Sequence, residues 1–120
     1  PALEVTEPGE AQFTVALVTG PLDKVVHLGR WDLRLTHSDW DGKTLRIYVG
    51  LGPTGSQYLA GFGQVESPQL SGWHSLADSS GRMEFFDFEP PPGAKSVAVK
   101  LGRPTVVIEG PWQVSVPVQR

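Results

Sequence analysis

The chain has 120 residues, no cysteine and a net charge of −3. This length is enough for one domain that removes roughly two-thirds of its unfolded surface from water without a disulfide or a metal, and the lack of cysteine excludes thiol catalysis and cysteine-ligated zinc. Basic residues are scattered, so no surface is predicted that would replace the counterions of a nucleic acid. We expect one domain over residues 1–120 that binds no nucleic acid.

The start of the chain indicates a processed product or an excised domain, because it begins at Pro1 and its only methionine is Met83. No apolar run is long enough to cross a bilayer or to form the core of a signal peptide. Any membrane attachment is therefore expected only through segments outside this sequence.

In the first half of the chain, apolar and polar residues alternate, which is the pattern of half-buried strands. Residues 1–9 mix acids with Pro and Gly and predict a short leader, and Gly20 and Pro21 predict a turn. Asp and Gly within residues 38–42 predict a tight hairpin turn. The predicted strands are residues 12–19, 29–36 and 44–51, while residues 22–28 fit either a strand or a connecting element.

The second half continues the pattern with more interruptions. Gly61 and Gly63 suggest a bulge or an edge, residues 67–81 are mostly turn around a possible short strand at 73–76, and the three prolines of residues 90–93 predict a rigid crossing between elements. The predicted strands are residues 57–66, 82–88, 96–101, 105–108 and 112–118.

Seven to nine short strands with no convincing amphipathic helix predict an all-β fold. Such spacing favours an immunoglobulin-like, two-sheet antiparallel β-sandwich over helical or doubly wound folds. In the final predicted strand, Trp112, Val114, Val116 and Val118 are expected to face inward, with Pro117 at an edge.

The last third of the chain resembles a known group of domains. LADSSGRMEFFDFEP, PPPGAKSVAVKL and VVIEGPWQVSVPV are similar to a hairpin, a proline-led strand and the terminal strands of immunoglobulin-like extracytoplasmic domains in bacterial membrane-anchored proteins related to anti-sigma factors. The resemblance implies a non-enzymatic module outside the cytoplasmic membrane, and it carries no catalytic residues.

Residues that could carry chemistry do not form a recognisable catalytic or metal motif. Asp39 and Asp41 could be half of a calcium site, but the spacing lacks further ligands and a hairpin turn is favoured. The three histidines share no zinc-ligand spacing. Glu84 and Asp87 point to opposite faces of one strand, and a solvated rim explains them better than paired catalytic carboxylates. We expect no catalytic residues, no metal and no cofactor.

Aromatic side chains are the strongest binding candidates. Trp31 and Trp112 are expected in the core, whereas Trp40 in a polar turn and Trp73 beside a glycine are candidates for exposure; packing at a sandwich end is the favoured reading of both. If they are exposed, they could stack on sugar rings together with Tyr58. Asp39 and Asp41 would then supply hydrogen bonds or calcium ligands.

The expected function is a non-enzymatic, extracytoplasmic sensing or protein-interaction module of a bacterial envelope protein, which recognises its partner by strand edges and end loops. Two alternatives remain. One is a carbohydrate-binding module that uses Trp40, Trp73 and Tyr58 with Asp39 and Asp41, and the other is a structural spacer or oligomer subunit.

Overall fold

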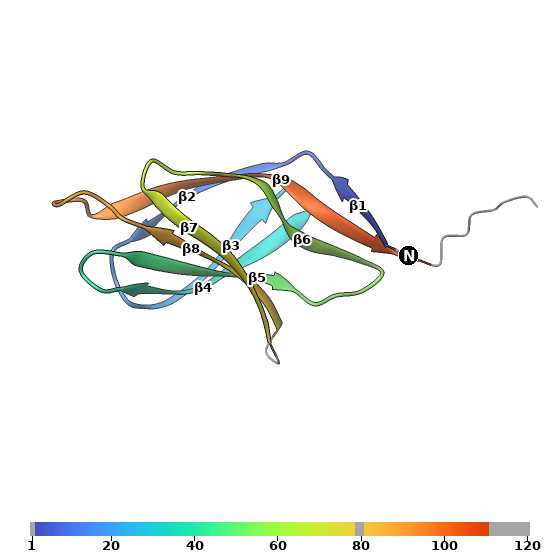
Figure 1. Cartoon of the computed structure of the whole chain (residues 1–120), viewed down its shortest axis with the longest axis horizontal. Helices are drawn as coiled ribbons and strands as arrows, with labels where there is room; N and C mark the ends of the chain where they lie inside the picture. Colours follow the sequence, from blue (N-terminus) through green and yellow to red (C-terminus); the bar gives the residue numbers. More distant parts are fainter. Residues whose placement is uncertain (1, 79–80, 111–120) are drawn as a thin grey trace, which may run out of the picture.

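The computed structural model describes residues 2–78 and 81–110, which form nine β-strands and no helix (Figure 1). No helix in this part of the chain has the length and hydropathy needed to cross a membrane. The strands are β1 (Ala2–Thr6), β2 (Glu10–Ala16), β3 (Gly20–Leu28), β4 (Trp31–Trp40), β5 (Leu45–Gly52), β6 (Gln57–Glu66), β7 (Leu70–Asp78), β8 (Gly81–Phe88) and β9 (Ser96–Glu109).

Two antiparallel sheets pack face to face. In the four-stranded sheet, β9 pairs with β6 along one edge, and with β2 and then β1 along the other. The five-stranded sheet has the order β3-β4-β5-β8-β7. The predicted all-β, two-sheet antiparallel sandwich of seven to nine strands is therefore confirmed.

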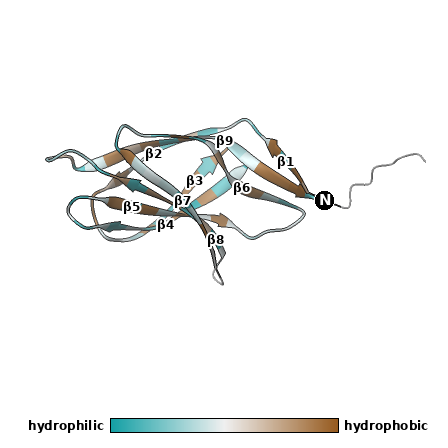
Figure 2. Ribbon diagram, in the orientation of Figure 1, coloured by the Kyte–Doolittle hydropathy of each residue, from teal (hydrophilic) through white to brown (hydrophobic). Residues whose placement is uncertain are grey.

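Alternating apolar residues from both sheets fill the space between them. In β5, Leu45, Ile47, Val49 and Leu51 are all buried, whereas Arg46 faces the other side of the sheet. Apolar segments of β5 and β9 are visible in Figure 2. Because a strand turns successive side chains to opposite faces, one face of each strand joins the core.

Several predicted elements are confirmed. The strand at residues 57–66 is β6, and its register shifts between Leu59 and Gly61, as the glycines suggested. The predicted hairpin joins β4 and β5, but its turn covers residues 41–44 and not 38–42, because β4 continues to Trp40. In this turn the Asp41 carboxylate accepts hydrogen bonds from the backbone N–H groups of Lys43 and Thr44. The proline-rich segment of residues 90–93 crosses from β8 in one sheet to β9 in the other.

Two predictions at the chain ends are wrong. The expected leader contains β1, which pairs with the second half of β9, and the two expected strands at 96–101 and 105–108 are one continuous strand. Arg103 has a φ of 54°. Before this local irregularity the buried core residues of β9 are odd-numbered, up to Leu101, whereas after it the buried core residue is the even-numbered Val106. The alternation is broken although pairing continues. The predicted strand at 112–118 lies outside the described residues.

Two further predictions failed in the five-stranded sheet. Gly20 and Pro21, expected in a turn, begin β3, where the register shifts between Pro21 and Lys24. Pro21 is tolerated because β3 is an edge strand and needs fewer backbone donors. Residues 67–81, expected to be mostly turn, contain the nine-residue strand β7, which pairs with β8.

The two sheets are in close backbone contact at the connection between β1 and β2. A Cβ on Gly9 would lie 2.9 Å from the backbone N of Gly29, and a Cβ on Gly29 would lie 2.9 Å from the Pro8 carbonyl oxygen. The backbone of the β3–β4 turn therefore rests directly on the backbone between β1 and β2. Gly29 also has a left-handed φ of 62°, which favours glycine.

Charged and aromatic side chains hold the same junction. Arg30 donates from Nε and Nη2 to the two carboxylate oxygens of Glu7 at 3.0 and 2.8 Å, and the Trp31 indole N–H donates to Glu7 at 2.9 Å. The Arg30 guanidinium also lies 4.4 Å from the centre of the Trp31 ring. The hydrogen bonds from Arg30 and then from Trp31 lower the pKa of the Glu7 carboxyl below its ordinary value.

Gly29→Ala should lower the free energy of unfolding by about 1–3 kcal/mol, because it combines a left-handed φ with backbone overlap. Urea denaturation would measure this loss. Gly55→Ala is the matched control, since Gly55 has no positive φ and an added Cβ has its nearest neighbour at 4.0 Å. A Gly29→Ala protein as stable as this control would contradict the proposed contact.

Stability should also fall in acid partly through Glu7. Because its pKa is lower in the folded state, the unfolded chain takes up the proton first, and the stabilisation present near neutral pH is lost as the pH falls below the ordinary glutamate value of about 4.3. Thermal melts of wild type and Glu7→Gln between pH 7 and pH 3 would check this. The advantage of wild type at pH 7 should shrink towards pH 3, and a constant difference would argue against it.

Candidate binding groove between β6 and β7

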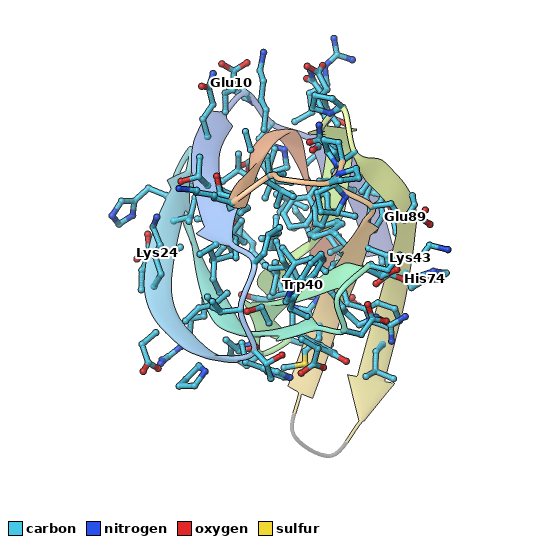
Figure 3. All side chains as sticks on the ribbon, turned by 90° about the vertical axis from the view of Figure 1, so that its left-hand side faces the viewer. Glu10, Lys24, Trp40, Lys43, His74 and Glu89 are labelled. Carbon is cyan, nitrogen blue, oxygen red and sulfur yellow. The ribbon has the colours of Figure 1, made fainter. Side chains whose placement is uncertain are left out.

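Of the residues singled out near the β4–β5 hairpin, Asp39 and Trp40 end strand β4 and only Asp41 lies in the turn. Trp40 is half-buried and packs against the core, between the sheets at one end of the sandwich (Figure 3). Asp41 is committed to the turn by its bonds to Lys43 and Thr44, and these bonds lower its pKa below the ordinary value, the bond from Thr44 most. Asp39 is exposed opposite Arg46.

Tyr58 and Trp73 lie elsewhere. Tyr58 on β6 has the Arg82 guanidinium 4.7 Å from its ring centre and donates its hydroxyl hydrogen to Glu109 at 3.2 Å. Trp73 lies on β7 and is 40% exposed. The five sequence candidates thus occupy three separate places and share no common platform. Within residues 2–78 and 81–110, no group of three or more His, Cys, Asp or Glu side chains is placed to hold a metal ion.

A row of four rings, the aromatic row, crosses the outer face of the five-stranded sheet. It consists of cross-strand partners on β4, β5, β8 and β7, namely His37, Tyr48, Phe85 and His74. The ring centres of His37 and Tyr48 are 4.1 Å apart with planes at 13°, and those of His74 and Phe85 are 4.9 Å apart. The guanidinium of Arg46 covers Phe85 at 4.2 Å.

The aromatic row stabilises the sheet but offers few free ring faces. Neighbouring cross-strand rings contribute roughly 0.5–1.5 kcal/mol per pair, and here each ring centre lies within 5.8 Å of the next, with His37 and Tyr48 stacked and the other pairs tilted. Arg46 is held over Phe85 by two hydrogen bonds to Asp87, at 2.7 and 2.9 Å. A sugar or planar ligand would have to displace these contacts.

A concave surface of about 880 Å³ lies by β2, β6 and β9, near Lys100 and Pro68. One of its charges is already paired, because Lys100 contacts Glu10 at 3.1 Å and this contact raises the pKa of the lysine. It is larger than the other hollow described below, but it contains no buried charged group and no exposed aromatic ring.

A groove of about 280 Å³ opens between β6 and β7. The five-stranded sheet is wider than the other sheet, in which β1 and β2 share one edge of β9. The lining residues come from β1, β6, β7, β8 and β9, and are Glu4, Ala60, Gly61, Phe62, Trp73, Ser75, Glu84 and Thr105.

Glu84 lies on the inner side of this groove and is only 3% exposed. The solvated rim predicted for Glu84 is therefore wrong, although Asp87 does face the opposite side. The Trp73 indole N–H and the Ser75 hydroxyl each donate to one oxygen of the Glu84 carboxylate. Both donors are neutral, and no described Lys, Arg or His forms a salt bridge with Glu84.

The ring of Trp73 completes one wall. It tilts against Phe86 with ring centres 5.9 Å apart, and Phe86 in turn contacts Phe62 of β6 at 6.0 Å. Opposite, Gly61 is buried, yet nothing lies within 4 Å of the position that its Cβ would occupy. The space in the groove thus depends on a missing side chain.

Sequence reasoning identified Trp73 but missed Glu84, Ser75 and Gly61. In residues 83–88, MEFFDF, apolar residues fall on both parities, so alternation cannot tell which face is inward. The usable signal was that Glu84 shares its parity with Phe86 and Phe88. Which of the two faces meets the other sheet is decided by the pairing of β8 between β5 and β7.

Replacing Glu84 with Met should leave the free energy of unfolding unchanged or raise it by about 1 kcal/mol, because an apolar side chain of similar size avoids the desolvation of a buried carboxylate. Phe86→Ala, on the same face of β8, should lower it by about 3–5 kcal/mol. Denaturant unfolding at pH 7 would compare them. A loss above about 1 kcal/mol in Glu84→Met would mean that the carboxylate serves the fold.

Comparison of the chain with protein-family models, with curated proteins and with solved structures finds no match. What the groove does must therefore be inferred from its own geometry.

Proposed function

We propose that the domain is a non-enzymatic protein-interaction module, which binds an extended segment of a partner protein in the groove between β6 and β7. The observation that carries the proposal is that this groove is lined by two strands, β6 and β7, each of which has a free edge. Among the described residues, β6 pairs only with β9 and β7 pairs only with β8. Both strands thus have one edge whose backbone groups can bond to an added chain.

An extended peptide suits such a site for two reasons. Its backbone can hydrogen-bond to an exposed strand edge, while alternate side chains enter pockets beside that edge. The groove supplies one such pocket, with an exposed indole at Trp73 and hydrogen-bonding groups at Ser75 and Glu84. Recognition by a strand edge is also what the sequence predicted.

Carbohydrate binding is less well supported, since it would have to rely on Trp73 alone. Trp40 packs against the core, and Tyr58 is covered by Arg82. Sugar-binding sites stack a ring on an open aromatic face, and Trp73 has one side turned to Phe86.

We further propose that the module acts outside the cytoplasm as part of a larger bacterial envelope protein. This rests only on the sequence resemblance of the last third of the chain. A parent reading frame that encodes an apolar segment of about 20 residues next to this domain would support a membrane-tethered module.

Selection from a displayed peptide library should yield peptides that bind the wild-type domain, with dissociation constants measured by calorimetry. Gly61→Leu should weaken these peptides at least about tenfold, because the added side chain has room in the fold and fills the groove. Trp73→Ala should weaken them by a similar factor, as expected for an aromatic anchor in a pocket.

Two controls match these variants. Gly55→Leu places the same side chain in a loop, and Val25→Ala removes an exposed apolar side chain on β3, the opposite edge strand. Both should bind as wild type does. The proposal fails if no peptide is enriched or if the selected peptides bind Gly61→Leu equally well, and binding of an oligosaccharide panel at Trp73 would instead favour the carbohydrate alternative.

A further inference from the structure

We propose that the groove selects a basic side chain, Lys or Arg, of the bound segment, and that Glu84 is the residue that recognises its positive charge. This inference rests on the proposed function and names the chemistry of the partner. It comes from the charges that line the groove, the burial of Glu84 and the position of Trp73.

The lining itself carries only negative charge, although Arg82, which lies outside the lining, attracts Glu84 electrostatically. Of its eight residues, Glu84 and Glu4 are acidic and none is Lys, Arg or His. A bound phosphate or carboxylate would meet two like charges, whereas an ammonium or guanidinium group would meet two opposite ones. Charge complementarity of this kind selects among partners.

Burial makes the charge of Glu84 count more than that of a surface carboxylate. Glu84 is 3% exposed and accepts one hydrogen bond from Trp73 and one from Ser75. A carboxylate has about four acceptor sites, so capacity remains for a further donor. Both of its present hydrogen-bond donors are neutral. A cation that enters the groove would therefore add a charge-assisted hydrogen bond to this desolvated carboxylate.

Arg82, the cation on the same strand as Glu84, already forms other contacts. Arg82 donates to the carbonyl oxygens of Leu59 and Gly52 and covers the ring of Tyr58. These contacts tie β8 to β6 and to the end of β5, so Arg82 serves as a structural clamp and does not form an ion pair with Glu84. Displacing it towards the groove would break those bonds.

The apolar wall of the groove can contact the methylene stem of a long basic side chain. Lys and Arg carry three or four methylene groups before the charge and lay them along apolar surface. Phe62, Trp73 and Gly61 offer such a surface, and the indole N–H bond to Glu84 holds the Trp73 ring beside the carboxylate. A cation at Glu84 would therefore also lie near an aromatic ring, which attracts it.

The experiment uses small probes as well as peptides. N-acetyl-lysine and N-acetyl-arginine methylamides would be titrated into the domain beside the neutral analogues of norleucine and citrulline, with binding followed by the NMR signal of the Trp73 indole N–H, assigned with Trp73→Phe. We expect the basic probes to bind at least about tenfold more tightly than the neutral ones. Peptides selected on the wild-type domain should show the same ratio when their basic residue is replaced.

Glu84→Gln should reduce this ratio to less than about twofold. Glu89→Gln is the matched control, because Glu89 is exposed just after the same strand and does not line the groove, and it should keep the ratio. If Glu84→Gln does not fold, Gly61→Leu keeps both carboxylates and should block basic probes by filling the space.

The outcomes separate this inference from the proposed function. Peptides that bind in the groove but do not distinguish basic from neutral residues would overturn the inference and leave the interaction module standing. Retention of the ratio in Glu84→Gln, or basic probes that bind Gly61→Leu unchanged, would also overturn it. Failure of every peptide to bind would remove the proposed function itself.

Discussion

Among residues 2–78 and 81–110, every pairing in the four-stranded sheet is made with β9, so this sheet depends on that one strand. It is bonded on both edges, to β6 on one side and to β2 and β1 on the other, and its inner face contributes Val99, Leu101 and Val106 to the core. Because β9 is the last strand described, its partners are far away in sequence. Such long-range pairing forms late and slows folding.

The same arrangement creates the groove. Because β1 and β2 share one edge of β9, fewer strands lie side by side around β9 than in the five-stranded sheet that it covers. Neighbouring strands are spaced ~4.8 Å apart, so the sheet around β9 is the narrower one. One side of the sandwich is closed where β2 meets β3, and β7 lies at the other edge of the five-stranded sheet. Residues of β7 and β8 that face inward, Trp73, Ser75 and Glu84, therefore line an opening instead of a sealed core. A buried carboxylate is tolerated there because two neighbouring side chains donate to it.

Much of the fold could be predicted from the sequence, but little of the site. Alternation in residues 44–51 correctly identified β5 and its buried face, and Asp41 with Gly42 correctly marked the hairpin. The sequence also placed Glu84 and Asp87 on opposite faces. It could not say which face was inward, since Phe85 and Phe86 make both faces of β8 aromatic. One face carries the aromatic row and the other the core, and a choice between them needs the neighbouring strands.

What the sequence determined by itself was the local backbone: period-two strands, tight turns and the proline-rich crossing at residues 90–93. These features depend on side-chain direction and on the dihedral preferences of Gly, Asp and Pro, which act over a few residues. Tertiary structure alone decided that residues 2–6 form a strand, that β9 runs unbroken past Arg103, and that Glu84 lies beside Trp73 under the open space at Gly61. Each of these depends on a partner strand distant in sequence, because unpaired backbone bonds and an uncovered face are properties of how sheets assemble and not of any one segment.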